Sequence, residues 1–290
     1  MTTTNTKLEF NWENLLTEAV TKPGKILAAY SLFHDYSLAN AMLALNQCEM
    51  HGIQPGPINT FPGWKALGRH VIKGQKAISL VMPITRKKRD EQNQHAADAA
   101  DPHDSRTSEC FTRFVFRPNW FVLSQTEGND VAATIAPNWN AERALSGLGI
   151  TRVEFATMNG NAQGYAASGK QIAINPVAAL PHKTMFHELA HVILGHTEEG
   201  LLSDDEQTPR NLREVEAECV ALLCCASLGL DGEEFARGYI QNWLGGANIP
   251  EKSAQKIFAA AAAILKAGQE TPQQKGEDAG RDGVHRNSLL

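Results

Sequence analysis

Apolar residues in the first 50 positions recur at the spacing of α-helices. They lie three or four residues apart over 12–20 and predict one amphipathic helix, which Pro23-Gly24 breaks. A second apolar stretch covers 26–48 and extends the helical pattern toward position 50. Thr60 suits the N-cap of a further short helix.

Between residues 71 and 124 the pattern changes to short apolar runs that are typical of β-strands. A polar segment over 90–109 interrupts them, with no aromatic residue and no β-branched residue except Thr107. Such a segment has little apolar surface to bury, so we expect a flexible insert within one small α+β unit. The predicted strands are 71–72, 77–84, 111–116 and 120–124.

Beyond a boundary near 128–140, two short strands precede a series of helices. Residues 153–155 and 171–175 have the pattern of strands, and 171–175 is predicted to be an edge strand to which an extended peptide could add. The polar, glycine-rich residues after Gly268 predict a disordered tail. The predicted helices are 184–194, 211–228, 232–243 and 253–266.

These patterns predict the α+β fold class and two domains. The first, over 1–130, is a small α+β domain; the second, over 131–267, is mainly helical; residues 268–290 form the tail. Charge differs along the chain in a similar way: residues 1–90 hold 11 Lys and Arg against 6 Asp and Glu, whereas residues 91–290 hold 16 against 26. The basic first part favours a polyanionic partner.

Composition argues against several classes of protein. No apolar run approaches the ~20 residues that span a bilayer, and no apolar signal segment follows the polar start, so we expect neither a membrane partner nor secretion. Five cysteines without a Cys-x-x-Cys pair favour reduced thiols over a disulfide framework. These observations predict a cytoplasmic protein.

The most specific chemical signal is residues 187–191, His-Glu-Leu-Ala-His, which have the pattern His-Glu-x-x-His. On a helix, histidines four residues apart project from one face and reach a single Zn²⁺. Glu188 lies between them and could act as general base on a metal-bound water. We therefore predict His187 and His191 as metal ligands and Glu188 as the catalytic residue. The alternative is two surface histidines on an amphipathic helix.

A third ligand is expected on the helix downstream, in the segment 213–218, Arg-Glu-Val-Glu-Ala-Glu. Glu214 and Glu218 share one helix face, and Glu216 points elsewhere. The segment resembles the gluzincin arrangement Glu-x-x-Ala-Asp/Asn/Glu, and this resemblance implies that Glu214 ligates the metal while Glu218 orients a ligating histidine. Glu218 itself and His196 are rival third ligands, and a solvated acidic helix face is the alternative to any ligand role.

Two histidines and one glutamate leave one coordination position open, which is typical of catalytic rather than structural zinc sites. Such a site polarises a scissile carbonyl, and Glu188 would pass a proton from water to the leaving amine. We expect Zn²⁺, although imidazole and carboxylate ligands also accept Mn²⁺ or Co²⁺. Tyr165 is a candidate donor to the oxyanion, with ordinary packing as its alternative.

A second signal is the basic stretch over 60–89, which contains no acidic residue and begins with two aromatic residues. Cations that follow phosphates, and rings that stack on bases, are what sequence-tolerant binding of single-stranded DNA requires. No zinc finger, helix-turn-helix or RNP pattern indicates base-specific recognition. The alternative is an ordinary basic surface with Trp64 in the core. The predicted DNA-binding residues are Phe61, Trp64, Lys65, Arg69, Lys73, Lys76, Arg86, Lys87, Lys88 and Arg89.

Five segments carry a resemblance to a known family: Phe61–Gly68, Val71–Lys76, Phe121–Gly128, His187–His191 and Glu214–Glu218. Together they resemble the ArdC-type antirestriction proteins of conjugative plasmids, which are related to the N-terminal part of TraC-type primases. The resemblance implies an N-terminal domain that binds single-stranded DNA and a C-terminal metalloprotease-like domain. It also implies protection of incoming plasmid DNA from host restriction enzymes. The polar insert departs from the family's pattern.

Alternative functions stay open at this point. One is an antirestriction protein that binds single-stranded DNA, with double-stranded DNA as a further partner and with the metal as an accessory group or only a structural clip. The other is a cytoplasmic zinc metalloprotease that cleaves a specific regulatory protein or a restriction–modification subunit. The histidine motif and the glutamate-rich helix also resemble those of ImmA/IrrE-like peptidases, which motivates this second function.

Overall fold

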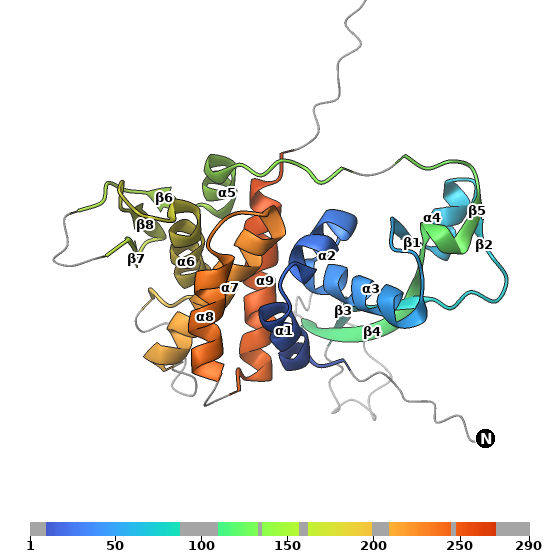
Figure 1. Cartoon of the computed structure of the whole chain (residues 1–290), viewed down its shortest axis with the longest axis horizontal. Helices are drawn as coiled ribbons and strands as arrows, with labels where there is room; N and C mark the ends of the chain where they lie inside the picture. Colours follow the sequence, from blue (N-terminus) through green and yellow to red (C-terminus); the bar gives the residue numbers. More distant parts are fainter. Residues whose placement is uncertain are drawn as a thin grey trace, which may run out of the picture.

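The computed structural model combines helices and strands, as the sequence predicts (Figure 1). We use the names N-terminal region for the described residues within 10–132 and C-terminal region for those within 135–270. In the described part of the chain, no helix combines the length and the apolar character that a membrane span requires. The structure describes residues 10–87, 110–132, 135–156, 162–198, 209–244 and 248–270.

The N-terminal region opens with the helices α1 (Trp12–Thr21), α2 (Lys25–Phe33) and α3 (Leu38–His51). Gly24 turns the chain between α1 and α2 with a φ of 76°, a left-handed conformation that favours glycine. The apolar stretch over 26–48 holds two helices, because residues 34–37 interrupt it. The Ser37 side chain then accepts a hydrogen bond from Asn40 N and begins α3.

Two small sheets and two short helices complete the N-terminal region: β1 (Ile58–Thr60), α4 (Phe61–Ala66), β2 (Arg69–Val71), β3 (Ile78–Lys87), β4 (Cys110–Val122), the 3-10 helix η1 (Leu123–Gln125) and β5 (Thr126–Gly128). β4 lies between β1 and β3 in one antiparallel sheet, and β2 pairs with β5 in the other. The strands predicted over 111–116 and 120–124 are one continuous strand. The predicted insert over 90–109 lies outside the described residues. The Thr60 side chain caps α4, as predicted, by accepting a hydrogen bond from Gly63 N.

The C-terminal region contains α5 (Ala141–Leu148), β6 (Thr151–Arg152), β7 (Gly164–Ala167), β8 (Gln171–Ile174), α6 (Pro181–Ile193), α7 (Arg210–Leu228), α8 (Glu233–Leu244) and α9 (Glu251–Gly268). Its sheet has the order β6-β8-β7, with β6 parallel and β7 antiparallel to β8. The prediction that 171–175 is an edge strand is therefore wrong. Ile172 and Ala173 point to opposite faces and are both buried, as in a strand covered on both sides. The strand predicted over 153–155 is also wrong, because β6 ends at Arg152 and only Val153 N continues its pairing.

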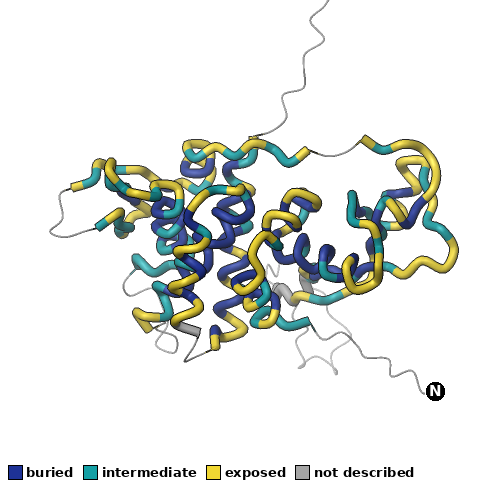
Figure 2. The backbone as a smooth tube through the Cα atoms, in the orientation of Figure 1, coloured by how far each residue is buried: buried dark blue, intermediate teal, exposed yellow. Residues whose placement is uncertain are grey.

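Helices α7 and α9 pack with helices of both regions in one hydrophobic core (Figures 1 and 2). Helix α1 illustrates the connection. The two carboxylate oxygens of Glu251, in α9, accept hydrogen bonds from Trp12 N and Glu13 N at 2.8 Å each. Arg237, in α8, donates to Ala19 O near the other end of α1. Glu251 thus places a negative charge at the N-terminus of α1, and Arg237 places a positive charge near its C-terminus. Each charge complements the helix dipole at its end. The free cysteines buried in this core are Cys48, Cys219, Cys224 and Cys225.

The two predicted sites lie at opposite ends of the long axis of the molecule. Figure 1 shows α4, β2 and β5, which belong to the basic stretch and its surroundings, at one end. The sheet strands β7 and β8 and the helix α6, with the histidine motif, lie toward the other end. Helices of the shared core occupy the space between them.

Candidate functional site

Helix α6 carries the histidine motif, and the sequence prediction of a helix here is confirmed. Pro181 occupies its first turn, where a missing N–H removes no intrahelical hydrogen bond. Beyond its end, Gly195 has a φ of 76°, which stops the helix as predicted. The buried residues that anchor α6 against α7 and the sheet are Thr184, Met185, Phe186, Leu189, Ala190 and Val192.

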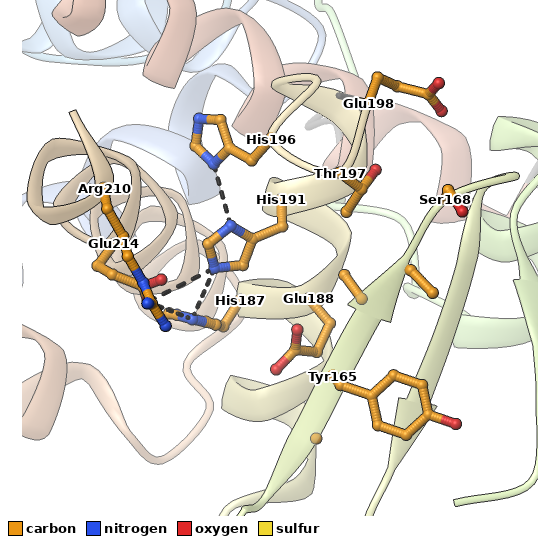
Figure 3. A pocket seen from close by; sticks show the side chains of 13 residues that line it. Tyr165, Ser168, His187, Glu188, His191, His196, Thr197, Glu198, Arg210 and Glu214 are labelled. Carbon is orange, nitrogen blue, oxygen red and sulfur yellow. Dashed lines mark hydrogen bonds and ion pairs between the residues drawn. The ribbon is translucent and has the colours of Figure 1, made fainter. Parts of the chain in front are cut away.

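Three predicted ligand atoms converge between α6 and α7 (Figure 3). His187 Nε2 and His191 Nε2 are 3.0 Å apart, and Glu214 Oε2 lies 3.5 Å from the first and 3.6 Å from the second. Ligand atoms about 2.0–2.1 Å from a tetrahedral metal ion lie about 3.3 Å from one another, so this triad has the spacing of a metal-binding set. Within the described residues, it is the one group of three or more His, Cys, Asp or Glu side chains whose ligand atoms lie close enough together to hold an ion.

Charge in the triad also favours a cation. Burial opposes protonation of His187, but Glu214 and Glu218 outweigh it and raise the pKa of this histidine to about 9. The neighbouring imidazoles of His187 and His191 in turn hold the pKa of Glu214 well below its ordinary value. The carboxylates therefore stabilise a positive charge at this point, carried either by a proton on His187 or by a metal ion that displaces the proton.

Glu188 lies in the same cleft, on the far side of the histidines from Glu214 (Figure 3). Its side chain is buried, and burial raises the pKa of its carboxyl group, although His187 and His191 act in the opposite direction. A raised pKa suits a carboxylate that takes up and releases a proton near neutral pH. The structure thus places Glu188 beside the triad, where the motif predicts it.

Gly164 allows the edge strand β7 to approach Glu188 closely. A Cβ atom at position 164 would lie 2.7 Å from Thr184 Cγ2, 2.9 Å from Ala173 O and 3.1 Å from Glu188 Oε1. β7 forms one wall of a cavity of about 820 Å³, and the first turn of α7 also lines it. The edge strand beside the motif is therefore β7 rather than β8.

Tyr165, the predicted donor to an oxyanion, does not face the triad. Its hydroxyl group donates a hydrogen bond to Glu154 O at 3.4 Å, and its ring lies 5.8 Å from that of Phe155. Figure 3 shows the hydroxyl directed away from His187 and His191. The prediction for Tyr165 is corrected accordingly: the side chain packs within the wall of the cleft, because alternation along β7 turns it outward.

Glu218 lies behind His187 rather than in the triad. Its Oε1 accepts a hydrogen bond from Lys183 Nζ at 2.8 Å and lies 3.4 Å from His187 Nδ1, the ring nitrogen that does not face Glu214. Glu218 is thus placed beside His187, a predicted ligand, and its carboxylate is not one of the three converging groups. The motifs do not reveal Lys183, although its spacing of four residues from His187 places it on the same helix face.

His196 and Glu216 also lie outside the triad. His196 Nδ1 is 3.0 Å from His191 Nδ1, and His196 Nε2 is 2.9 Å from Glu216 Oε2. Burial lowers the pKa of His196 despite the neighbouring carboxylate, and Glu216 is only 2% exposed. His196 therefore contacts the outer nitrogen of His191 and does not fit the rival assignment as third ligand. Glu216 points elsewhere, as predicted, but toward a histidine rather than toward solvent.

The two aromatic residues of the predicted DNA-binding stretch differ in exposure. Phe61 is 53% exposed at the start of α4, whereas Trp64 is 1% exposed. The indole Nε1 of Trp64 donates to Phe121 O at 2.9 Å. The prediction that Trp64 stacks on a base is therefore wrong, because its ring is buried in the fold. Phe61 stays a candidate for stacking.

Arg69 uses most of its donors within the fold. Its Nε donates to Thr126 Oγ1 at 2.8 Å, Nη2 donates to Thr126 O at 2.9 Å, and Nη1 donates to Gly128 O at 3.2 Å. These bonds tie β2 to β5, which also pair through their backbones. Arg69 therefore has few donors left for a phosphate.

The remaining predicted cations divide into two sets. Lys65, Lys73 and Lys76 are exposed, in α4 and in the connection between β2 and β3. Figure 1 shows α4, which contains Phe61 and Lys65, at the same end of the molecule as β2. Of the basic cluster, Arg86 and Lys87 end β3, and Lys88 and Arg89 lie outside the described residues.

Comparison with protein families gives one match in each part of the chain. Residues 6–115 match the N-terminal domain of anti-restriction factor ArdC. Residues 145–235 match the IrrE N-terminal-like domain, of the M78 peptidases, and this span contains Glu188 and the whole triad. The prediction of two domains is confirmed by these matches.

Solved structures of one protein are similar to this chain. The Mn(II)-bound crystal structure of the antirestriction ArdC protein from plasmid R388 has a TM-score of 0.51 and 16% sequence identity, and the likeness covers 89% of this chain and 97% of that one. Its metal-free structure has a TM-score of 0.49 and 20% identity, over 89% and 94% of the two chains. The first likeness shows a shared fold. No curated protein matches the chain.

Proposed function

We propose that this chain, whose two parts match the ArdC N-terminal domain and an IrrE-like peptidase domain, is an ArdC-type antirestriction protein that binds single-stranded DNA at one end and a divalent metal ion at the other. The observation that carries the proposal is the triad of His187, His191 and Glu214 beside the buried Glu188, in a chain whose first part matches the ArdC N-terminal domain. Coating of the incoming strand would protect plasmid DNA from host restriction enzymes.

His187, His191 and Glu214 would hold the ion through Nε2, Nε2 and Oε2. We propose Zn²⁺, because two imidazoles and one carboxylate with an open position are typical of catalytic zinc sites. The same ligand types accept Mn²⁺ and Co²⁺, and the similar ArdC structure contains Mn(II). A divalent ion at such a site lowers the pKa of a water molecule and polarises a carbonyl group.

Glu188 would carry the proton of a peptidase-like site. Its carboxylate lies in the cleft, and its raised pKa favours taking a proton from water and giving it to a leaving amine. Glu218 would orient His187, with Lys183 holding Glu218 in place. One edge of β7 has no strand beside it in the described part of the chain, and an extended peptide could add there.

At the other end, Phe61, Lys65, Lys73 and Lys76 would contact DNA. The lysines supply charges that follow the phosphates, and the exposed ring of Phe61 supplies a surface on which a base can stack. The same lysines would bind double-stranded DNA with less affinity, because paired bases are not free to stack on Phe61. Arg69 would add its charge from within the β2–β5 pair.

Proteolysis of a regulatory protein, or of a restriction–modification subunit, is a second candidate function. The match of residues 145–235 to an IrrE-like peptidase domain favours it, and so does the cavity of about 820 Å³ beside an edge strand. In this alternative, restriction is prevented by cleavage of a protein rather than by coating of DNA.

Fluorescence anisotropy of labelled oligonucleotides across a salt series, together with metal analysis, tests the proposal. The variants are Glu188→Ala, the double variant Lys73→Ala/Lys76→Ala, and Lys266→Ala as a matched control on an exposed lysine of the C-terminal region. We expect salt-sensitive binding of single strands that Glu188→Ala and Lys266→Ala retain and that the double variant weakens. Wild-type protein that binds no single strand would overturn the DNA part and leave proteolysis. Protein without stoichiometric divalent metal would overturn the metal part.

A further inference from the structure

Two glutamates of α7 support the two histidines of the triad in different ways. Glu218 faces His187 directly, with 3.4 Å between Oε1 and Nδ1. Glu216 reaches His191 only through His196. His191 and His187 turn their Nε2 atoms toward each other and toward Glu214, so each histidine has its Nδ1 on the side of one supporting carboxylate. The pair His196–Glu216 is not part of the predicted motif.

The chain reversal after α6 brings His196 back to His191. Gly195 adopts a left-handed conformation with a φ of 76°, and His196 N then donates to His191 O at 2.8 Å. The two imidazole rings lie 5.1 Å apart, centre to centre. The side chains of His196 and Glu216 are 6% and 2% exposed. Solvent is therefore largely excluded from the chain of contacts that runs from His191 to Glu216.

The hydrogen-bonding capacity of these groups fixes their protons. A carboxylate only accepts, so His196 Nε2, 2.9 Å from Glu216 Oε2, must carry a hydrogen. In a neutral imidazole the other nitrogen is then an acceptor, so His196 Nδ1 accepts from His191 Nδ1 at 3.0 Å. In a neutral His191 imidazole, Nε2 consequently carries the lone pair, and this is the atom that faces His187 and Glu214.

We propose that Glu216 and His196 are positioning residues that fix His191 in the Nδ1–H tautomer, so that Nε2 is ready to ligate a divalent metal ion. This inference rests on the proposed metal site. Glu214 and Glu216 lie two residues apart on one helix, so a single turn of α7 supplies both a ligand and the carboxylate that prepares another ligand. The orientation of His191 is then set by the protein before the ion binds.

The tautomer can be measured without metal. In metal-free protein labelled with ¹⁵N-histidine, long-range ¹H–¹⁵N correlation spectra near neutral pH separate the two nitrogens of His191. The variants are Glu216→Gln, whose amide can donate as well as accept, and His196→Phe, which removes the acceptor and keeps a ring. Glu218→Gln is the crossed control, because Glu218 faces His187 and not His191. Circular dichroism and thermal unfolding identify any variant that does not fold.

In the wild type we expect Nδ1–H on His191, and in Glu216→Gln and His196→Phe a shift toward the Nε2–H tautomer. Affinity for Mn²⁺, measured by calorimetry, should fall about 10–100-fold in both variants. Glu218→Gln should lower metal affinity while leaving the His191 tautomer unchanged. An Nε2–H tautomer in the wild type, or an unchanged tautomer in both folded variants, would overturn the inference. Wild-type protein that takes up no metal overturns the proposed function instead, and the spectra of the metal-free protein distinguish the two failures.

Discussion

The two ends of this molecule are built on different principles. At one end, which we call the metal end, the side chains of His187, His191 and Glu214 converge between α6 and α7 and are partly buried. His196 and Glu218 contact the outer nitrogens of the two histidines. At the other end, the basic end, Lys65 in α4 and Lys73 and Lys76 between β2 and β3 are exposed and do not converge on one point. This arrangement suits a ligand that is held along its charged backbone rather than at one atom. A site that acts on one bond needs fixed geometry, whereas a surface that follows a flexible polyanion needs charge and an accessible ring.

The largest expected effect is a loss of metal binding at the metal end without a change in DNA binding at the basic end. Glu214→Gln removes the negative ligand of the triad, and we expect metal affinity to fall by more than about 100-fold, since even residues that only support ligands cost about 10–100-fold. Calorimetry with Mn²⁺ and metal analysis after dialysis measure the change. Single-strand binding should stay within about twofold, since the basic end does not use Glu214.

Glu198→Gln is the matched control for this prediction, because Glu198 lines the same cavity but does not join the triad. It should keep the metal affinity of the wild type. If Glu214→Gln keeps that affinity while Glu218→Gln loses it, then Glu218 is the third ligand after all.

A smaller effect should distinguish the two aromatic residues of α4. Trp64→Phe removes buried volume and the hydrogen bond to Phe121 O, and we expect a loss of about 3 kcal/mol in the free energy of unfolding. Phe61→Ala should change that free energy by less than about 0.5 kcal/mol, because its ring is half exposed. Urea unfolding measures both values.

The affinity for DNA, measured by fluorescence anisotropy, should rank the same two variants in the opposite order. Phe61→Ala should weaken single-strand binding by about 1 kcal/mol, the lower end for one stacked base, and leave double-strand binding nearly unchanged. Folded Trp64→Phe should bind DNA as the wild type does. Equal losses of affinity in the two variants would mean that Phe61 acts through the fold and not through stacking.

Loss of two lysines of the basic end should weaken DNA binding to an extent that depends on the salt concentration. In Lys73→Ala/Lys76→Ala we expect about a tenfold loss of single-strand affinity at low salt. The slope of log affinity against log salt concentration should fall by about 1.4, or ~0.7 for each phosphate contact that is lost. An unchanged slope would place the DNA elsewhere on the molecule. Metal affinity should not change.

Local spacing explains what could be predicted from the sequence. The helix of residues 187–191 fixes the relation of His187, Glu188 and His191, and a second helix fixes that of Glu214 and Glu218. The meeting of these two helices is a tertiary contact, and only the resemblance to gluzincins indicated it. The overall class and the two-domain organisation followed from hydrophobic patterning and from the family resemblance.

Non-local packing explains what could not be predicted. Trp64 is buried because Phe121, 57 residues away, accepts its indole N–H, and no spacing near α4 signals this. The edge strand was misplaced because Gly164–Ala167 has little of the β-branched and aromatic character of strands, and because the close approach of Gly164 to α6 is a tertiary contact that no local pattern signals. The contact between His196 and Glu216 was missed because the sequence does not distinguish a buried carboxylate from a solvated one.

The smallest expected effect tests whether the two ends belong to one folding unit. Glu251→Gln removes the charge that accepts hydrogen bonds from Trp12 N and Glu13 N, and we expect a loss of about 1 kcal/mol. Because α1 packs into the core shared by both regions, hydrogen exchange of amides in α3 and α7 should report the same loss. Glu13→Gln, in the same helical turn but without a capping contact, should cost only a few tenths of a kcal/mol. A loss confined to α3 would mean that the basic end and the metal end unfold separately, despite their continuous core.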